Sequence, residues 1–287
     1  MSEKMLNTMC GLLGIGVEDS NLNGDPDANG EPRIDPKGFG VCSGVSIKRK
    51  VRDVVMEKDG PVWQYIERKL GVNPEECGIF EDPNVAWDYL SELNQDGLLP
   101  KKFWDVRMFG VAFLDQKGKN GESRKRSYCG GMQISFGRSL RPIEIETMTN
   151  TRRRGSEPDK NSGMAPNGFS YIPHGLYVVR YYVNPTLAKK IGCTRQDIEI
   201  FLHAVPYMFS HTMSRTRVGV KLLSAWHVES NSPLGSRKAE DLMESLAPYS
   251  KEKGVTTPST SFDDYVFPEP PPTLPSEVCE VRNLLDC

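Results

Sequence analysis

Apolar residues either alternate with polar ones or run continuously in five stretches of the chain, and both patterns are typical of β-strands. The clearest stretch, GLYVVRYYV, is rich in the β-branched and aromatic residues that strands favour. The predicted strands cover residues 5–17, 105–114, 129–136, 175–183 and 217–229.

Between these strands, apolar residues recur with helical spacing. One stripe at positions i, i+4, i+7 and i+8 predicts a helix over about residues 43–58, and it consists of Ile47, Val51, Val54 and Val55. A second helix is expected after Thr194, because Thr194 and Asp197 have the spacing of an N-cap and an acidic third residue. Further helices are predicted at about residues 61–70, 84–94 and 237–246.

Set in chain order, these elements predict one α+β domain with two insertions. Without the insertions, the order is β-α-β-β-α-β, which is that of a ferredoxin-like core. The insertions are a helical segment at about residues 60–103 and a loop rich in Gly, Pro, Ser and Asn at about 147–173. We expect the domain to cover residues 1–253 and to be followed by a Pro-rich tail, 254–287, that is extended or disordered.

The overall charge excludes a simple protein that coats nucleic acid. The 287 residues carry a formal net charge of −2, whereas a basic domain is expected for such a protein. Positive charge is instead concentrated in three clusters, at residues 48–52, 124–126 and 152–154. Two of these clusters lie in predicted loops, which favours a binding function over an ordinary solvated face.

Other compositional signals exclude further classes. No apolar run approaches the ~18 residues of a membrane span, and the N-terminal residues lack the features of a signal peptide. The seven cysteines are scattered without a C-x-x-C pair, so neither a disulfide framework nor a zinc site is indicated. We therefore expect no cofactor, no metal and a reducing cytoplasmic location.

The start of the predicted helix 43–58 is the strongest candidate for a binding site. Lys48, Arg49 and Arg52 share an arc beside the apolar stripe, and Lys50 lies on its other flank. Free N–H groups and the helix dipole favour phosphate at such a start. The alternative is an exposed helix face on which Arg49 pairs with a carboxylate one turn later. We favour phosphate binding.

The loop before this helix has acidic residues that invite a different interpretation. The residues Asp25, Asp27, Asn29 and Gly30 match the opening of a calcium-binding loop. However, Pro36 stands where that loop needs a glutamate ligand. We therefore reject a calcium site and interpret these acids as turn-forming residues.

The 147–173 loop is the second candidate for a binding segment. It contains three consecutive arginines, Arg152, Arg153 and Arg154, followed by the apolar residues Met164 and Phe169. Apolar side chains presented in this way can wedge between stacked bases. The alternative is a disordered surface loop.

Six motifs together resemble a known family over nearly the whole chain up to about residue 250. They are NGDPDANGEPRID, VSIKRKVRD, DVRMFGVAF, GGMQISFGRSLRPI, IPHGLYVVRYYVNPTLA and KLLSAWHVE. The sequence resembles the backbone subunit of the type I-C CRISPR surveillance complex (Cascade), a member of the RAMP superfamily with a core like that of the RNA-recognition motif (RRM). The first two motifs are the most specific.

The resemblance implies a non-catalytic subunit whose copies polymerise along CRISPR guide RNA and, with other Cascade subunits, recognise target DNA. It implies an RRM-like palm that grips the RNA backbone, fingers at about residues 60–103 and a thumb at 147–173. A basic loop such as 118–128 is a candidate contact for target DNA. The predicted RNA-binding residues are Ser46, Lys48, Arg49, Lys50, Arg52, Arg138, Arg152, Arg153, Arg154, Met164 and Phe169.

Two enzymatic alternatives remain. Related RAMP subunits cut target RNA with a loop aspartate, and Asp25 and Asp27 are the candidates here. A metabolic enzyme would need a convergent acid–base or nucleophile–His arrangement, and the four scattered histidines do not suggest one. The type I-C resemblance favours the structural role over both.

Overall fold

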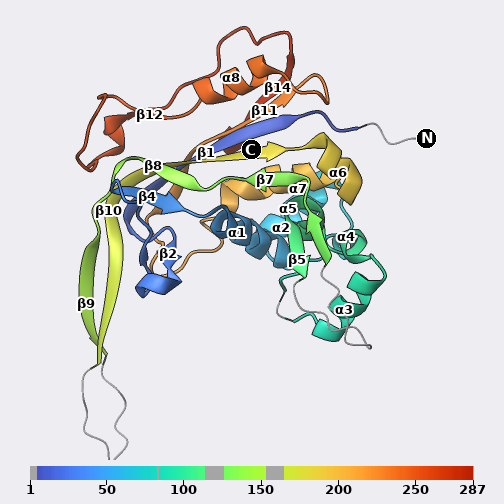
Figure 1. The fold of residues 1–287 in the computed structure, drawn as a ribbon, viewed down its shortest axis with the longest axis horizontal. Helices are drawn as coiled ribbons and strands as arrows, with labels where there is room; N and C mark the ends of the chain where they lie inside the picture. Colours follow the sequence, from blue (N-terminus) through green and yellow to red (C-terminus); the bar gives the residue numbers. More distant parts are fainter. Residues whose placement is uncertain (1–4, 83, 114–125, 153–164, 287) are drawn as a thin grey trace, which may run out of the picture.

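The computed structural model describes residues 5–82, 84–113, 126–152 and 165–286. Its centre is an antiparallel sheet in the order β14-β11-β1-β10-β8-β4, with β7 and β9 also pairing with β10 (Figure 1). These strands are β1 (Met9–Ser20), β4 (Phe39–Cys42), β7 (Met132–Ile134), β8 (Gly137–Pro142), β9 (Glu146–Arg152), β10 (Ala165–Val183), β11 (Val220–Ser230) and β14 (Val278–Asn283).

A ferredoxin-like core lies within this sheet. In chain order it consists of β1, α1 (Gly44–Met56), β8, β10, α7 (Arg195–Ala204) and β11, which is the β-α-β-β-α-β order. Strand β1 lies between β10 and β11 and is antiparallel to both. The predicted mixed α+β fold class is therefore confirmed.

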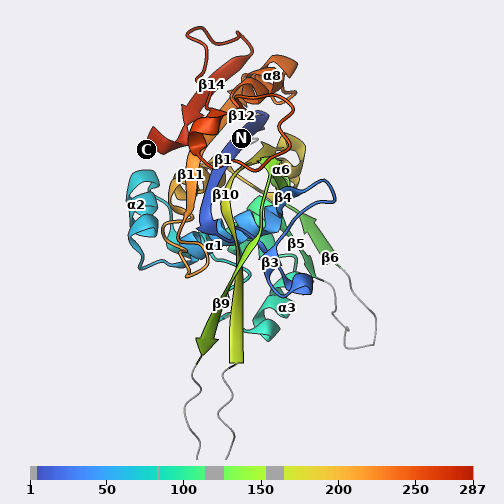
Figure 2. The same cartoon turned by 90° about the vertical axis from the view of Figure 1, so that its left-hand side faces the viewer.

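Helices cover the two faces of the sheet unequally. Helices α1, α2 (Pro61–Leu70) and α7 pack on one face, and α8 (Arg237–Ser245) packs on the other (Figures 1 and 2). Side chains of β1 alternate between the two sides. Leu13 and Ile15 belong to the large core under α1 and α7, whereas Cys10 and Leu12 belong to the smaller core under α8.

A buried ion pair joins α7 to α5 (Trp104–Phe109). Thr194 and Asp197 form the predicted capping box at the start of α7. The Asp197 carboxylate also accepts two hydrogen bonds from the Arg107 guanidinium, from Nε at 3.0 Å and from Nη2 at 2.7 Å. This bidentate geometry fixes the orientation of α5 relative to α7.

The prediction of a strand over residues 105–114 is wrong for its first half. Residues 104–109 form α5, and β5 (Gly110–Phe113) pairs with β6 (Arg126–Cys129) in a separate small sheet. Every side chain of α5 is buried, including the charged Asp105 and Arg107, so the segment has no amphipathic period by which to tell a helix from a strand. The second strand of the core is β8 instead.

The predicted helical insertion, residues 60–103, is divided between two cores. Helix α2 contributes Val62, Trp63 and Ile66 to the large core. Helices α3 (Trp87–Gln95) and α4 (Leu99–Lys102) pack in a cluster of their own. That cluster consists of Leu90, Leu93, Leu99, Phe103 and Val106.

The 147–173 segment is not the irregular loop that its composition suggested. Strands β9 and β10 form a long hairpin stem, paired from Glu146 opposite Tyr171 to Arg152 opposite Ala165. The stem projects away from the body of the molecule (Figures 1 and 2). Residues 153–164 lie outside the described part of the chain.

The C-terminal segment returns to the sheet. Strand β12 (Tyr249–Ser250) pairs with β13 (Tyr265–Val266), and β14 adds to the edge of the main sheet beside β11. Between β12 and β13, the Phe262 ring lies so close to Gly16 of β1 that a Cβ there would be 2.7 Å from it. The segment therefore covers part of the α8 face of the sheet.

The remaining elements are short. They are β2 (Gly24–Asp25), β3 (Glu31–Pro32), α6 (Pro185–Ile191) and the 3₁₀ helices at Pro26–Ala28, Pro74–Glu76, Val205–Tyr207, Phe262–Asp264 and Leu284–Asp286. Among the described helices, none has both the length and the apolar character needed to span a membrane.

Candidate nucleic-acid interface

The start of α1 is held by the loop that precedes it. Ser43 is the N-cap, and its Oγ accepts a hydrogen bond from the Ser46 N–H at 3.2 Å. The Asn23 side chain accepts the Ser43 N–H at 2.7 Å, which ties the loop to the helix. Helix α1 therefore begins at a fixed point, where its dipole and first N–H groups favour an anion.

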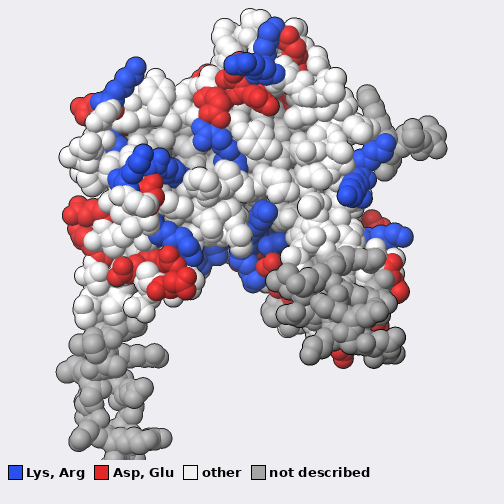
Figure 3. Space-filling view, in the orientation of Figure 1, with Lys and Arg blue, Asp and Glu red and all other residues white. Residues whose placement is uncertain are grey.

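Two cations of α1 are available for such an anion. Lys48 is half-buried, and none of the described carboxylates lies within ion-pair distance of its Nζ. Burial, followed by the nearby Arg52 guanidinium, lowers the pKa of Lys48. Arg49 is 44% exposed, pairs with Asp53 at 2.6 Å and lies 3.8 Å from Glu81. Lysine and arginine side chains gather over α1 in the space-filling view (Figure 3).

The other two predicted cations of α1 point into the protein. The Arg52 side chain is 7% exposed and its Nε lies 2.9 Å from Asp105, while Nη1 lies 3.2 Å from Glu81. Lys50 is also buried, 3.7 Å from Asp53. The sequence pattern placed Arg52 beside the apolar stripe but gave no sign of the acidic partner on α5. An RNA contact by Lys50 or Arg52 stays a prediction, and both residues have packing partners that compete with it.

Arg138 lies in β8 rather than beyond a strand, and it is 43% exposed. Its guanidinium lies 4.1 Å from the centroid of the Phe39 ring and 2.6 Å from the Asp35 carboxylate. The Phe39 N–H donates to Asp35, and this bond is the main cause of the lowered pKa of Asp35, with the Lys37 N–H and Arg138 adding to it. Asp35 thus fixes the turn before β4 and orients Arg138.

The structure describes only some of the predicted thumb residues. Arg152 ends β9 opposite Ala165, whereas Arg153, Arg154 and Met164 lie outside the described residues. Phe169 lies on the hairpin stem and stacks on Tyr171 with ring centroids 5.9 Å apart. Its role as a wedge stays a prediction. In the basic loop 118–128, only residues 126–128 are described.

The loop aspartates have turn-forming partners. Asp25 accepts the Asp27 N–H at 3.2 Å as the cap of a 3₁₀ helix and lies 3.3 Å from Arg33. Asn29 follows in the left-handed conformation. These contacts are those of an Asx-turn, which is the role that the sequence suggested.

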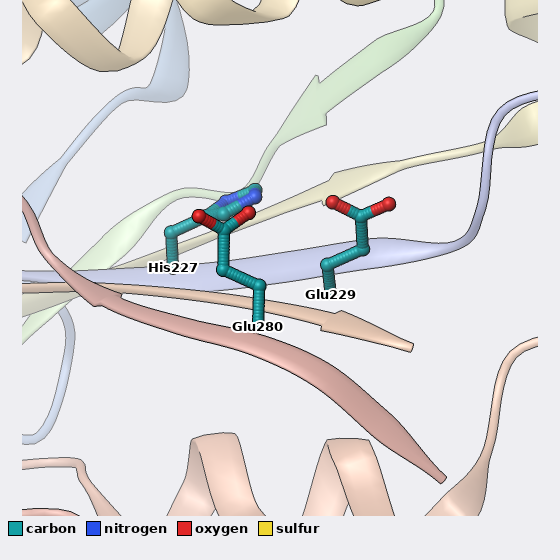
Figure 4. A group of neighbouring side chains, drawn as sticks. All are labelled: His227, Glu229 and Glu280. Carbon is teal, nitrogen blue, oxygen red and sulfur yellow. The ribbon is translucent and has the colours of Figure 1, made fainter. Parts of the chain in front are cut away.

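Among the described residues, the buried His227 and Glu229 and the half-buried Glu280 form a cluster of residue types that bind metals (Figure 4). Its carboxylates are already engaged. Arg195 pairs with both glutamates, and the Arg282 guanidinium lies 2.7 Å from Glu280. Two guanidinium groups repel a cation, so we interpret this cluster as an ion-pair network that joins α7 to β11 and β14.

The same network explains an unusual histidine. His227 is fully buried, and its Nδ1 lies 3.0 Å from the Tyr181 hydroxyl. Burial, followed by the positive charge of Arg282, lowers the pKa of His227 to about 4. His227 is therefore neutral at pH 7.

Sequence reasoning missed two contributors to this surface. Phe136, between β7 and β8, is 68% exposed, which is unusual for a large aromatic ring. Phe39 supports Arg138 from the neighbouring strand. In the sequence, Phe39 and Phe136 stand next to glycines, and Phe136 is also two positions from Arg138. Such neighbours do not distinguish an exposed aromatic ring from a buried one.

Comparison with known proteins decides the family. Residues 7–268 match the family described as CRISPR-associated protein Cas7. The chain belongs to the Cas7 family. In this Cas7-family chain, the matched region ends between β13 and β14, so β14 lies outside it.

Solved structures give a weaker likeness. A chain of a "CRISPR RNA-guided surveillance complex, pre-nicking" is 14% identical over 78% of this chain and 78% of its own, with a TM-score of 0.48. A chain of a "CRISPR RNA-guided surveillance complex" is 15% identical over 78% of this chain and 69% of its own, with a TM-score of 0.45. A search of curated proteins finds no match.

Proposed function

We propose that this Cas7-family chain is a non-catalytic subunit that binds CRISPR guide RNA and polymerises along it as the backbone of a type I-C Cascade complex. The observation that carries the proposal is the start of α1. There, a capped helix terminus is followed within two turns by two partly exposed cations, Lys48 and Arg49. Such a surface recognises phosphates without reading bases, as guide binding requires.

The other components of the proposal rest on the family and on the motifs. Ser46 and Arg138 add to the phosphate-binding surface, and the β9–β10 hairpin is the thumb. Other Cascade subunits are the protein partners, and target DNA is reached through the guide. The described cysteines are all free, which supports a reducing cytoplasmic location.

The test is co-expression of the chain with a CRISPR array, followed by measurement of the A260/A280 ratio and size-exclusion mass. We expect an RNA-containing oligomer. The double variant Lys48→Ala with Arg49→Ala should lose the RNA, because two adjacent phosphate contacts are removed. Lys238→Ala is the matched control, since this exposed lysine lies on α8, away from α1, and pairs with Glu277. Unchanged RNA content in the double variant would contradict the proposal.

The salt dependence of RNA binding gives a second readout. For single strands, each phosphate contact contributes about 0.7 to the slope of log K against log salt concentration. The double variant should therefore reduce the magnitude of the slope by about 1.4. Regular cleavage of complementary RNA with Mg²⁺, lost in Asp25→Ala, would instead support the endoribonuclease alternative.

A further inference from the structure

A pocket of about 510 Å³ lies on the α8 side of the sheet, outside the α1 surface. Its lining comes from the neighbouring strands β4, β8 and β10, from the turn before β8 and from the residues that follow α8. The main lining residues are Phe39, Phe136, Arg138, Val178, Arg180 and Pro248. A volume of this size accommodates a small planar ligand.

Aromatic and guanidinium groups dominate this pocket. Phe136 leaves 68% of its surface exposed, which is unusual for a large aromatic ring. The Arg138 guanidinium lies 4.1 Å from the Phe39 ring centroid and keeps 43% of its side chain exposed. Aromatic rings and guanidinium planes are the groups on which proteins stack unpaired bases.

Two arginines place guanidinium groups in the lining of the pocket. None of the described residues that line it is acidic, and two are arginines. Each arginine is held in place from outside the lining, Arg138 by Asp35 and Arg180 by two bonds to Glu244. Fixed guanidinium groups provide hydrogen-bond donors to base edges and to phosphate.

The start of α1 lies next to the turn that lines this pocket. A Cβ on Gly44, the first residue of α1, would lie 2.4 Å from the carbonyl oxygen of Ile134 and 2.9 Å from that of Ser135. The helix start therefore touches the chain immediately before Phe136.

We propose that this pocket holds one unpaired nucleobase of the RNA, stacked against Phe136 and the Phe39–Arg138 pair. The inference rests on the proposed function, because the phosphate contacts at α1 bring the strand to the pocket. It adds a contact to the base itself, which the proposed phosphate contacts do not require. Stacking is tolerant of sequence, since every base has a π-face.

The experiment measures binding of a fluorescein-labelled single-stranded RNA to the full chain by fluorescence anisotropy, over a series of salt concentrations. Phe136→Ala should weaken binding about 5- to 150-fold, the range for loss of one stacked base. The salt slope should stay unchanged, because no phosphate contact is removed. Phe136→Leu should recover little, and Leu234→Ala is the control, since this 96% exposed leucine lies outside the pocket.

An abasic version of the RNA makes the test independent of folding defects. Removing the bases should weaken binding to the wild-type chain, and Phe136→Ala should then have no further effect. Equal affinity of the wild type and Phe136→Ala for intact RNA would overturn the inference. An equal loss with abasic RNA would also overturn it, as would a change in self-association alone, which would assign the pocket to a protein contact.

The results for the two sets of variants distinguish failure of the base pocket from failure of the proposed function. If Lys48→Ala with Arg49→Ala loses RNA and Phe136→Ala does not, only the base pocket fails. If the lysine and arginine double variant binds RNA like the wild type, the proposed function fails first.

Discussion

Replacement of Arg52 by alanine distinguishes a folding role from an RNA contact. The Arg52 side chain is 7% exposed and its partner Asp105 is 1% exposed, with 2.9 Å between Nε and Oδ2. Asp105 also accepts the Phe80 N–H at 2.9 Å, so its carboxylate is held in place without Arg52. Arg52→Ala would thus leave a buried negative charge with only a neutral donor.

The expected cost follows from this burial. Breaking a buried ion pair by removing one partner costs about 3–5 kcal/mol. With a urea m-value of roughly 3 kcal/mol/M, this cost lowers the unfolding midpoint by about 1–1.7 M. Arg49→Ala is the matched control one turn away, because its pair with Asp53 is surface-exposed and is worth only about 0.3–0.5 kcal/mol.

The assay is urea unfolding of the purified chain, followed by tryptophan fluorescence, with RNA content measured in parallel. A second variant, Arg52→Met with Asp105→Asn, removes both charges and keeps a side-chain oxygen for the Phe80 N–H. We expect it to recover at least half of the lost stability. If Arg52→Ala lost RNA while its unfolding midpoint stayed within 0.3 M, a shift of about 1 kcal/mol or less, our reasoning from burial would be refuted.

Two further perturbations follow from the fold, besides the α1 and Phe136 variants described above. Because burial and Arg282 lower the pKa of His227 to about 4, the unfolded chain binds a proton between pH 6.5 and 4 that the folded chain excludes. As the pH falls from 6.5 to 4, the free energy of unfolding should therefore decrease by up to about 3 kcal/mol. His227→Gln should flatten this dependence of unfolding free energy on pH, which chemical unfolding at several pH values measures. Gly110 has a φ of 75°, and a Cβ there would lie 2.2 Å from the Tyr128 carbonyl oxygen, so Gly110→Ala should lower the melting temperature by many degrees. Gly192, with a φ of 79° and open space around it, is its control, and Gly192→Ala should cost only about 1 kcal/mol; similar losses for both glycines would contradict the argument from packing.

Local patterns predicted the elements whose signals are local. The stripe of Ile47, Val51 and Val55 is buried under the sheet as expected, and Thr194 with Asp197 forms the capping box. These signals are contained within two turns of helix, so no distant partner is needed to interpret them.

The predictions that were wrong or incomplete have a common physical cause. In each case, the local structure depends on residues that are far away in the sequence. Residues 104–109 are buried on all sides, so their helix is specified by Asp197 and the surrounding core rather than by a period. Strand β9 has a polar sequence, and only its pairing with β10 makes it regular. Arg52 looked like a surface cation because its acidic partner, Asp105, is 53 positions away.

The sequence also predicted only part of the candidate site. The sequence indicated the start of α1 and four of its cations, but it did not indicate which of these side chains reach solvent. It contained no sign of the pocket at Phe136, because the lining comes from strands that meet only in the folded sheet.

Strand β14 covers the outer side of β11 and is itself the edge of the main sheet. It pairs with β11 through residues such as Val281 opposite Val228, and so occupies backbone groups that would otherwise form an open edge. Open edges recruit strands from other molecules and lead to uncontrolled aggregation. A chain shortened at residue 268, where the family match ends, would present the β11 edge to every neighbour. The last strand therefore replaces an edge strand of 11 residues by one of 6 residues, and a shorter edge is less open to pairing with another molecule.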